Sequence, residues 1–84
     1  MANLVNLSID TRTFPEICKS LTKSEWVKMQ GDLILKVKRS GQCIYNWKVG
    51  KRTPSSPSER KAVSDYINKY FKLNTRYWYL FPES

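Results

Sequence analysis

The segment from Lys36 to Ser56 concentrates the side chains whose chemistry suggests a ligand. Residues 36–52 hold six cationic residues and no acidic one, which is most of the net charge of +8 carried by the 84-residue chain. Clustered like charges repel one another and are favoured where a partner of opposite charge binds. Nucleic acid is the commonest such partner, so we expect a nucleic-acid interface here. The six cations are Lys36, Lys38, Arg39, Lys48, Lys51 and Arg52.

Three uncharged polar side chains in the same segment have the chemistry to recognise bases. Gln42 and Asn46 are of the types that bond bidentately to adenine, and Tyr45 can stack, touch a thymine methyl or bond a phosphate. Cations on either side of them would lie along the sugar-phosphate backbones and supply affinity. We therefore predict base contacts for Gln42, Tyr45 and Asn46. The predicted phosphate-binding residues are Lys38, Arg39, Ser40, Lys51, Arg52 and Ser55.

The chain lacks the residues that several catalytic and metal-binding chemistries need. It has no histidine and two cysteines, Cys18 and Cys43. A structural zinc site draws four ligands mainly from Cys and His, and a nucleophile–histidine–carboxylate triad needs histidine. No paired carboxylates have a spacing that suggests a metal site. We expect no enzyme activity, no metal, no cofactor and two reduced thiols.

Length and apolar pattern bound the class of protein. A chain of 9.9 kDa makes one small domain, which we place at residues 1–84 with its core at about 14–72. The longest aliphatic run is Leu33-Ile34-Leu35, far shorter than a membrane span, and the first residues lack the pattern of a signal peptide. We expect a cytoplasmic, nucleoid-associated protein that makes no membrane contact.

Capping signals predict where the helices begin. Thr13 and Thr22 each precede a glutamate by three residues, which is the spacing of a capping box. Ser40 and Ser56 precede two further helices, and Pro57 suits the first position of the second. The predicted helices cover about 14–20, from the Thr22 cap to Val37, 41–49 and 57–72. Their apolar stripes are Trp26, Met29, Leu33, Ile34 and Val37 in the second, Ile44 and Trp47 in the third, and Ala62, Val63, Tyr66, Ile67, Tyr70 and Phe71 in the fourth.

Both ends of the chain carry strand signals. Residues 4–9 alternate apolar and polar side chains, and residues 76–81 are almost all aromatic or aliphatic. A hydrophobic strand of this kind must pack on the core or on another subunit. We therefore expect the two termini to pair in a short β ribbon across a mainly α domain.

Residues 40–55 read Ser-Gly-Gln-Cys-Ile-Tyr-Asn-Trp-Lys-Val-Gly-Lys-Arg-Thr-Pro-Ser. This stretch resembles the recognition helix and following loop of the lambda-repressor/Cro-like helix-turn-helix family, as found on bacterial mobile elements. That family shows an Ile-Tyr-Asn-Trp-like stretch, a later glycine, and Pro-Ser before the next helix. The matching residues are Ile44, Tyr45, Asn46, Trp47, Gly50, Pro54 and Ser55.

The resemblance implies a four- or five-helix helix-turn-helix domain that binds double-stranded DNA in a sequence-specific manner. It implies a transcriptional regulator or mobile-element accessory factor, often acting as a homodimer on a two-fold site. Where the family has a small residue and a turn glycine before its recognition helix, this chain has Ile34 and Lys38, so we expect either a non-standard turn or a different arrangement of the two helices. The resemblance places Ser40, Gln42, Tyr45 and Asn46 at the DNA and Cys43, Ile44 and Trp47 inside.

Two other functions fit parts of the sequence. The aromatic C-terminus of a basic protein could stack the bases of single-stranded DNA or RNA. A protein-interaction module would use its charge for solubility alone. Competition between duplex and single strands separates the first alternative from duplex recognition, and steeply salt-dependent affinity would count against the second.

Overall fold

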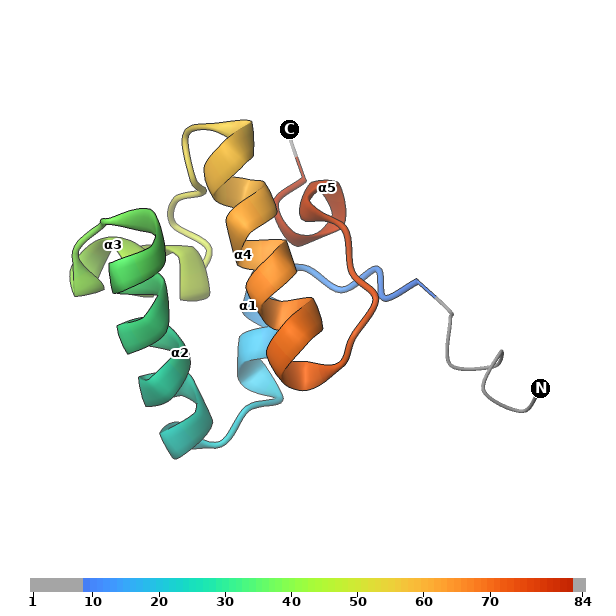
Figure 1. Cartoon of the computed structure of the whole chain (residues 1–84), viewed down its shortest axis with the longest axis horizontal. Helices are drawn as coiled ribbons and strands as arrows, with labels where there is room; N and C mark the ends of the chain where they lie inside the picture. The colour runs from blue at the N-terminus through green and yellow to red at the C-terminus, as the bar shows by residue number, and fades with distance from the viewer. Residues whose placement is uncertain (1–8, 83–84) are drawn as a thin grey trace.

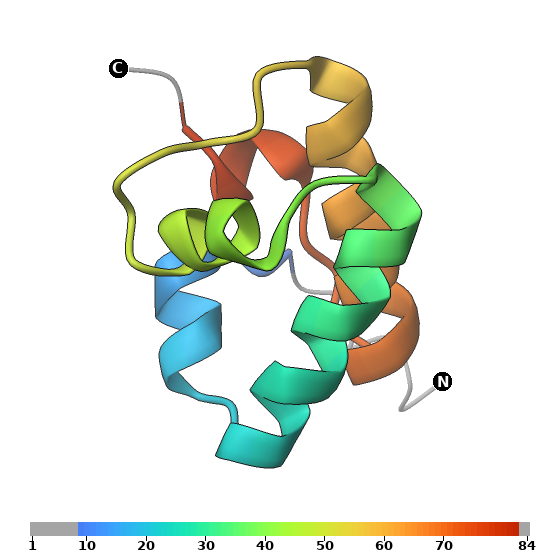
Figure 2. The same cartoon turned by 90° about the vertical axis from the view of Figure 1, so that its left-hand side faces the viewer.

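The computed structural model describes residues 9–82, in which five helices are connected by short loops. Figures 1 and 2 show α2 and α4 as the two long helices, with the shorter α1, α3 and α5 packed around them. The helices are α1 (Phe14–Lys19), α2 (Lys23–Val37), α3 (Gly41–Lys48), α4 (Pro57–Phe71) and α5 (Tyr77–Leu80). The mainly α architecture and the bounds of α1 to α4 agree with the sequence-based prediction.

The first four helices begin at the hydroxyl caps that the sequence indicates. The Thr13 and Thr22 hydroxyls each accept the backbone N–H of the third helical residue. The Glu16 and Glu25 carboxylates in turn accept the backbone N–H of the cap residue. Ser40 and Ser56 cap α3 and α4 in the same way, accepting N–H groups three residues along. Each cap satisfies a backbone donor that the helix itself leaves unpaired, so local sequence determines these starts.

The core forms where the apolar faces of the helices meet. α2 packs against α3 and α4, α1 against α3 and α5, and α4 against α5. The predicted stripes are largely buried there, although Tyr70 is 51% exposed and lies stacked on Tyr66. The buried apolar residues are Phe14, Ile17, Cys18, Trp26, Met29, Leu33, Ile44, Trp47, Val63, Tyr66, Ile67, Leu80 and Phe81.

The predicted C-terminal strand at 76–81 is wrong, because Tyr77–Leu80 form the helix α5. A strand would turn successive side chains to opposite faces, whereas one helical turn directs Leu80 and Phe81 into the core together. Phe81 packs there on Phe14 and Trp47, with ring centroids 5.3 and 6.1 Å away. This burial outweighs the high β propensity of the aromatic run.

The predicted partner strand at residues 4–9 lies outside the described residues except for its last position. Within 9–82 no β ribbon forms, and the two end segments meet at one isolated parallel bridge between Asp10 and Thr75. The Asp10 N–H donates to the Asn74 carbonyl at 2.9 Å. The ends of the described chain are therefore neighbours without forming a sheet.

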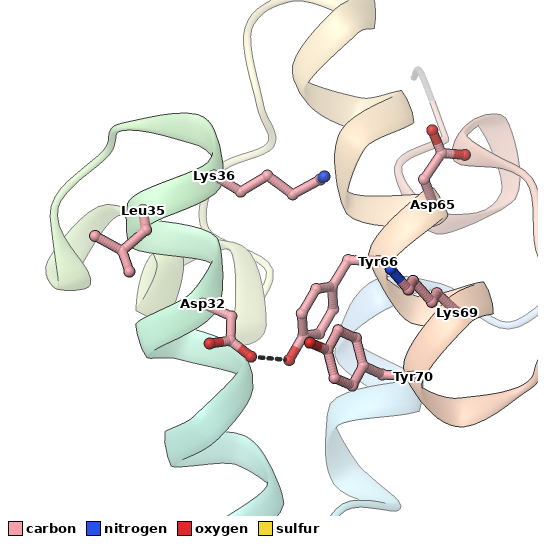
Figure 3. A pocket seen from close by; sticks show the side chains of 7 residues that line it. All are labelled: Asp32, Leu35, Lys36, Asp65, Tyr66, Lys69 and Tyr70. Atoms are coloured by element: carbon pink, nitrogen blue, oxygen red, sulfur yellow. Dashed lines mark hydrogen bonds between the residues drawn. The ribbon is translucent and has the colours of Figure 1, made fainter.

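α2 and α4 enclose a groove of about 420 Å³ that carries both signs of charge (Figure 3). The Tyr66 hydroxyl donates to the Asp32 carboxylate at 2.6 Å and joins the two helices. Lys36 and Lys69 also line the groove, as Figure 3 shows. The Tyr66–Asp32 hydrogen bond helps to hold α2 against α4, and α3 packs in turn against α2.

α2 ends at a strained residue. Lys38 caps the helix with φ 58° and ψ 44°, in the left-handed region where a side chain clashes with its own backbone. Replacing Lys38 by glycine is expected to raise the free energy of unfolding by about 0.5–1 kcal/mol, because glycine adopts this conformation without strain. Urea denaturation measures the change.

The matched control for Lys38→Gly is Lys36→Gly, one half-turn earlier in α2. Lys36 has ordinary helical geometry and an exposed side chain, so glycine there should lower the free energy of unfolding by about 1 kcal/mol. A loss of stability in both variants would show that the left-handed conformation carries no strain.

Candidate nucleic-acid interface

α3 lies at the edge of the molecule with one face buried and the other open. Figure 1 places it beside α2 at the side away from α5, and Figure 2 shows it lying across the front of the molecule. Ile44 and Trp47 are buried at 0% and 2% exposure, as the spacing predicts. Tyr45 and Val49 on the other side are 42% and 43% exposed. The open face is therefore available to a ligand.

The turn before α3 is short and held at both ends. α2 ends at Val37 and α3 begins at Gly41, so three residues make the turn. The Gln30 side chain donates from Nε2 to the Gly41 carbonyl at 3.0 Å and ties the start of α3 to α2. This contact could not be predicted from the sequence, since a glutamine eleven residues upstream carries no local signal. The start of α3 is therefore held against α2.

Two of the predicted base-reading side chains form a pair. Gln42 Nε2 donates to Asn46 Oδ1 at 3.2 Å, across one turn of α3. The side-chain carbonyl oxygen of Gln42 and the side-chain amide hydrogens of Asn46 stay available for a ligand. The Asn46 backbone carbonyl accepts the N–H groups of Lys51 and Arg52, which fixes the basic loop against the end of α3. The structure thus brings the amide pair and two predicted phosphate contacts together.

The predicted phosphate-binding residues divide into two groups in the structure. Lys38, Lys51 and Arg52 are exposed and form no ion pair with any residue in 9–82. The Ser40 hydroxyl accepts the Cys43 N–H at 3.2 Å as the helix cap. This group stands at the two ends of α3, where the sequence analysis expects the backbones of a duplex.

Arg39 and Ser55 belong to a network with a residue that the sequence analysis missed. Arg39 Nε lies 2.6 Å from Glu59 Oε2, and Arg39 Nη2 donates to the Ser55 hydroxyl and to Glu59 Oε1. Glu59 stands in the first turn of α4, twenty residues after Arg39, so no local pattern pairs the two. The network joins the α2–α3 turn to α4.

One cation of the basic segment serves packing. Lys48 Nζ lies 4.8 Å from the ring centroid of Trp26 and 5.7 Å from that of Tyr45. A cation over an aromatic face is attracted by the ring quadrupole, which holds the Tyr45 ring against α3. The charge of Lys48 therefore helps to position a predicted base contact.

The C-terminal aromatic run offers little surface for stacking bases. Leu80 and Phe81 are buried, Tyr77 and Tyr79 are half-buried, and Trp78 alone in this run is exposed, at 52%. A single-strand binder presents several exposed rings in succession. The structure therefore gives the single-strand alternative less support than the sequence does.

Sites for metals or reactive thiols are not evident among residues 9–82. No three side chains of the His, Cys, Asp or Glu type gather there as a metal site. Cys18 and Cys43 are free thiols, and burial raises the pKa of Cys18 to about 12, which disfavours its reactive thiolate. Within the same range, none of the helices combines the length and apolarity that a membrane crossing requires.

Comparison with known proteins finds no relative of this chain. No protein-family model, no curated protein and no solved structure matches the chain. Function is therefore inferred from the geometry of α3 and its surroundings.

The carboxylates that hold this geometry make the fold sensitive to acid. Hydrogen bonds from Arg39 lower the pKa of Glu59 below 4.5, and a hydrogen bond from Tyr66 lowers the pKa of Asp32 below 3.8. A folded-state pKa below the unfolded value adds stability above the unfolded pKa, and this stability is lost as the pH falls through the folded pKa. Thermal unfolding midpoints should be constant from about pH 7 to 5 and fall steadily below about pH 4.

The Glu59→Gln variant isolates one contribution to this acid response. It should have a lower unfolding midpoint at pH 7 and a smaller drop between pH 5 and pH 3, because it lacks the titrating carboxylate. An unfolding midpoint that rises on acidification, or an unchanged acid response in Glu59→Gln, would contradict the assignment.

Proposed function

We propose that this protein binds double-stranded DNA in a sequence-specific manner, with α3 in the major groove. The observation that carries the proposal is the open face of α3, where the paired amides of Gln42 and Asn46 stand beside Tyr45. An α-helix fits the major groove of B-form DNA, where Gln and Asn can recognise adenine. The chain then acts as a transcriptional regulator or an accessory factor of a mobile element, without enzyme activity.

The connection between α2 and α3 supports a helix-turn-helix arrangement of the lambda-repressor/Cro-like type. Lys38 stands where that family has its turn glycine, and its backbone adopts the left-handed conformation that glycine favours. The expected departure in the turn therefore concerns the side chain rather than the backbone path. The Gln30 contact to Gly41 further supports a fixed angle between the two helices.

Charge supports a duplex over a neutral partner. Lys38 stands at the start of α3 and Lys51 and Arg52 stand just past its end, all exposed. A helix in the major groove lies between two sugar-phosphate backbones, so cations at both of its ends would meet phosphates. Such contacts set register and affinity, while the amides set sequence.

Selection of bound duplexes from a random pool tests the proposal. The expected result is enrichment of a short motif that contains adenine opposite the Gln42–Asn46 pair, with single strands of the same sequence competing poorly. An enriched palindrome would also establish a homodimer on a two-fold site. Recovery of unrelated duplexes at equal frequency, or preferential recovery of single strands, would overturn the proposal.

Lys51→Ala is expected to weaken binding to all duplexes alike. Loss of one phosphate contact should reduce the slope of log affinity against log salt concentration by about 1, with the selected motif unchanged. Fluorescence anisotropy at four or more salt concentrations measures the slope. Lys23→Ala, an exposed lysine at the far end of α2, is the control and should leave the slope as in the wild type. Motif-dependent losses for Lys51→Ala would argue against a phosphate contact.

A further inference from the structure

A small pocket of about 160 Å³ opens between α3 and the loop that leads to α4. The α2–α3 turn, the flank of α3 and the loop at 51–56 all contribute residues to this pocket. Arg39 and Arg52, which stand at opposite ends of α3, therefore line one cavity. The lining residues are Arg39, Cys43, Trp47, Arg52, Thr53, Pro54 and Ser55.

The lining is divided between an apolar floor and a polar rim. Trp47 and Pro54 are buried, and Cys43 is half-buried and packs against the core. Arg39, Arg52 and Thr53 are exposed and supply N–H and O–H groups around the opening, whereas the Ser55 hydroxyl donates to Glu59 Oε1 at 3.3 Å. A rim rich in donors over a rigid floor suits a compact anion with several acceptor oxygens.

Glu59 orients Arg39 without occupying all of its donors. The carboxylate takes bonds from Nε and Nη2 at 2.6 and 3.2 Å, and Nη2 also donates to Ser55 at 3.4 Å. The two N–H groups on Nη1 donate to no other described residue. Glu59 does not line the pocket, so it orients the Arg39 guanidinium and leaves the Nη1 donors available to an anion.

Arg52 supplies the charge that Glu59 does not cancel. Its backbone N–H donates to the Asn46 carbonyl at 3.3 Å, which holds the loop, while its side chain takes part in no ion pair within residues 9–82. Two guanidiniums and one carboxylate leave the cluster with a net charge of +1. Planar guanidiniums match the oxygens of a phosphate bidentately, which a lysine cannot do.

We infer that this pocket binds one phosphate oxyanion between Arg39 and Arg52, with Thr53 donating from the rim. The phosphate group belongs either to a DNA backbone or to a free phosphate compound, and the chemistry of recognition is the same. The backbone assignment rests on the proposed function, because it requires a duplex lying along α3. The pocket itself does not depend on that function.

The first experiment titrates the full chain with inorganic phosphate and follows the Nε–H signals of Arg39 and Arg52 by NMR. Chloride at equal ionic strength is the reference. Both signals should shift and saturate with phosphate, and Arg52→Gln should abolish the saturable shift of Arg39. Lys72→Gln, which removes an exposed cation at the end of α4, should leave it intact. Unchanged amide signals elsewhere show that each variant is folded.

The second experiment uses the selected duplex with single phosphates replaced by neutral methylphosphonates. If the pocket takes a backbone phosphate, one replacement should weaken the wild type about tenfold and have little effect on Arg52→Gln. If phosphate shifts the arginine signals but no replacement behaves in this way, the pocket takes a free phosphate. Phosphate shifts without duplex binding would leave the pocket standing and defeat the proposed function. If neither inorganic phosphate nor any backbone position engages the two arginines, the inference is overturned, even where duplex binding itself is found.

Discussion

Replacing Trp47 by alanine is expected to lower the free energy of unfolding by about 3–5 kcal/mol. The indole is 2% exposed and packs edge-on against Phe81 with ring centroids 6.1 Å apart. It projects from α3 into the region where α1 and α5 meet, so its loss opens a cavity at the junction of three helices. A domain of this size has a small total stability, so the variant should be largely unfolded at room temperature.

Urea denaturation followed by circular dichroism measures this effect, with Trp78→Ala as the matched control. Trp78 is 52% exposed on α5, so its truncation should cost less than about 1 kcal/mol. Trp47→Phe should retain most of the packing and fall between the two. Equal losses of stability at both tryptophans would mean that the buried face of α3 does not hold the helix in place. The proposed interface would then lack a fixed α3.

The same indole shows how much of the fold a sequence pattern can convey. Ile44 and Trp47 are three residues apart in a segment that begins with a serine cap, and this pattern alone predicts a short helix with one inward face. Caps and stripes act over one or two turns, so the local sequence contains all the information they need. The bounds of α1 to α4 follow from such signals.

The contacts that orient α3 could not be predicted in this way. Gln30 reaches the Gly41 carbonyl, and Arg39 reaches Glu59 twenty residues further along. Any exposed glutamine or arginine has the chemistry for such contacts, and the choice of partner depends on how the helices pack. The sequence analysis assigned Arg39 and Ser55 to phosphate, whereas the structure shows that both also stabilise the turn.

The C-terminal error has a related cause. The run from Tyr77 to Phe81 has high β propensity, but propensity describes an average surface, and here the Phe14 and Trp47 rings define the surface to be covered. One turn of helix places adjacent residues, Leu80 and Phe81, on that surface. Tertiary packing therefore overrides a preference that spans less than about 1 kcal/mol per residue.

The Gln42→Ala substitution addresses the proposed base recognition most directly. Its expected effect is a loss of about 1–3 kcal/mol on the selected duplex and little change on unrelated duplexes. Gln42 is exposed and bonds only to Asn46 among the described side chains, so its removal should leave the fold intact while removing half of the amide pair. The freed Asn46 amide would then lose its fixed orientation and add to the loss of discrimination.

The test measures the affinities of the wild type, Gln42→Ala and a control variant on the selected duplex and on a scrambled one. Leu35→Ala is the control, because that side chain is 78% exposed on α2 and lines the groove between α2 and α4. It should leave both affinities unchanged. A uniform loss on both duplexes for Gln42→Ala would assign Gln42 to general affinity, in which case sequence selection would have to come from Tyr45, Asn46 or the shape of the duplex.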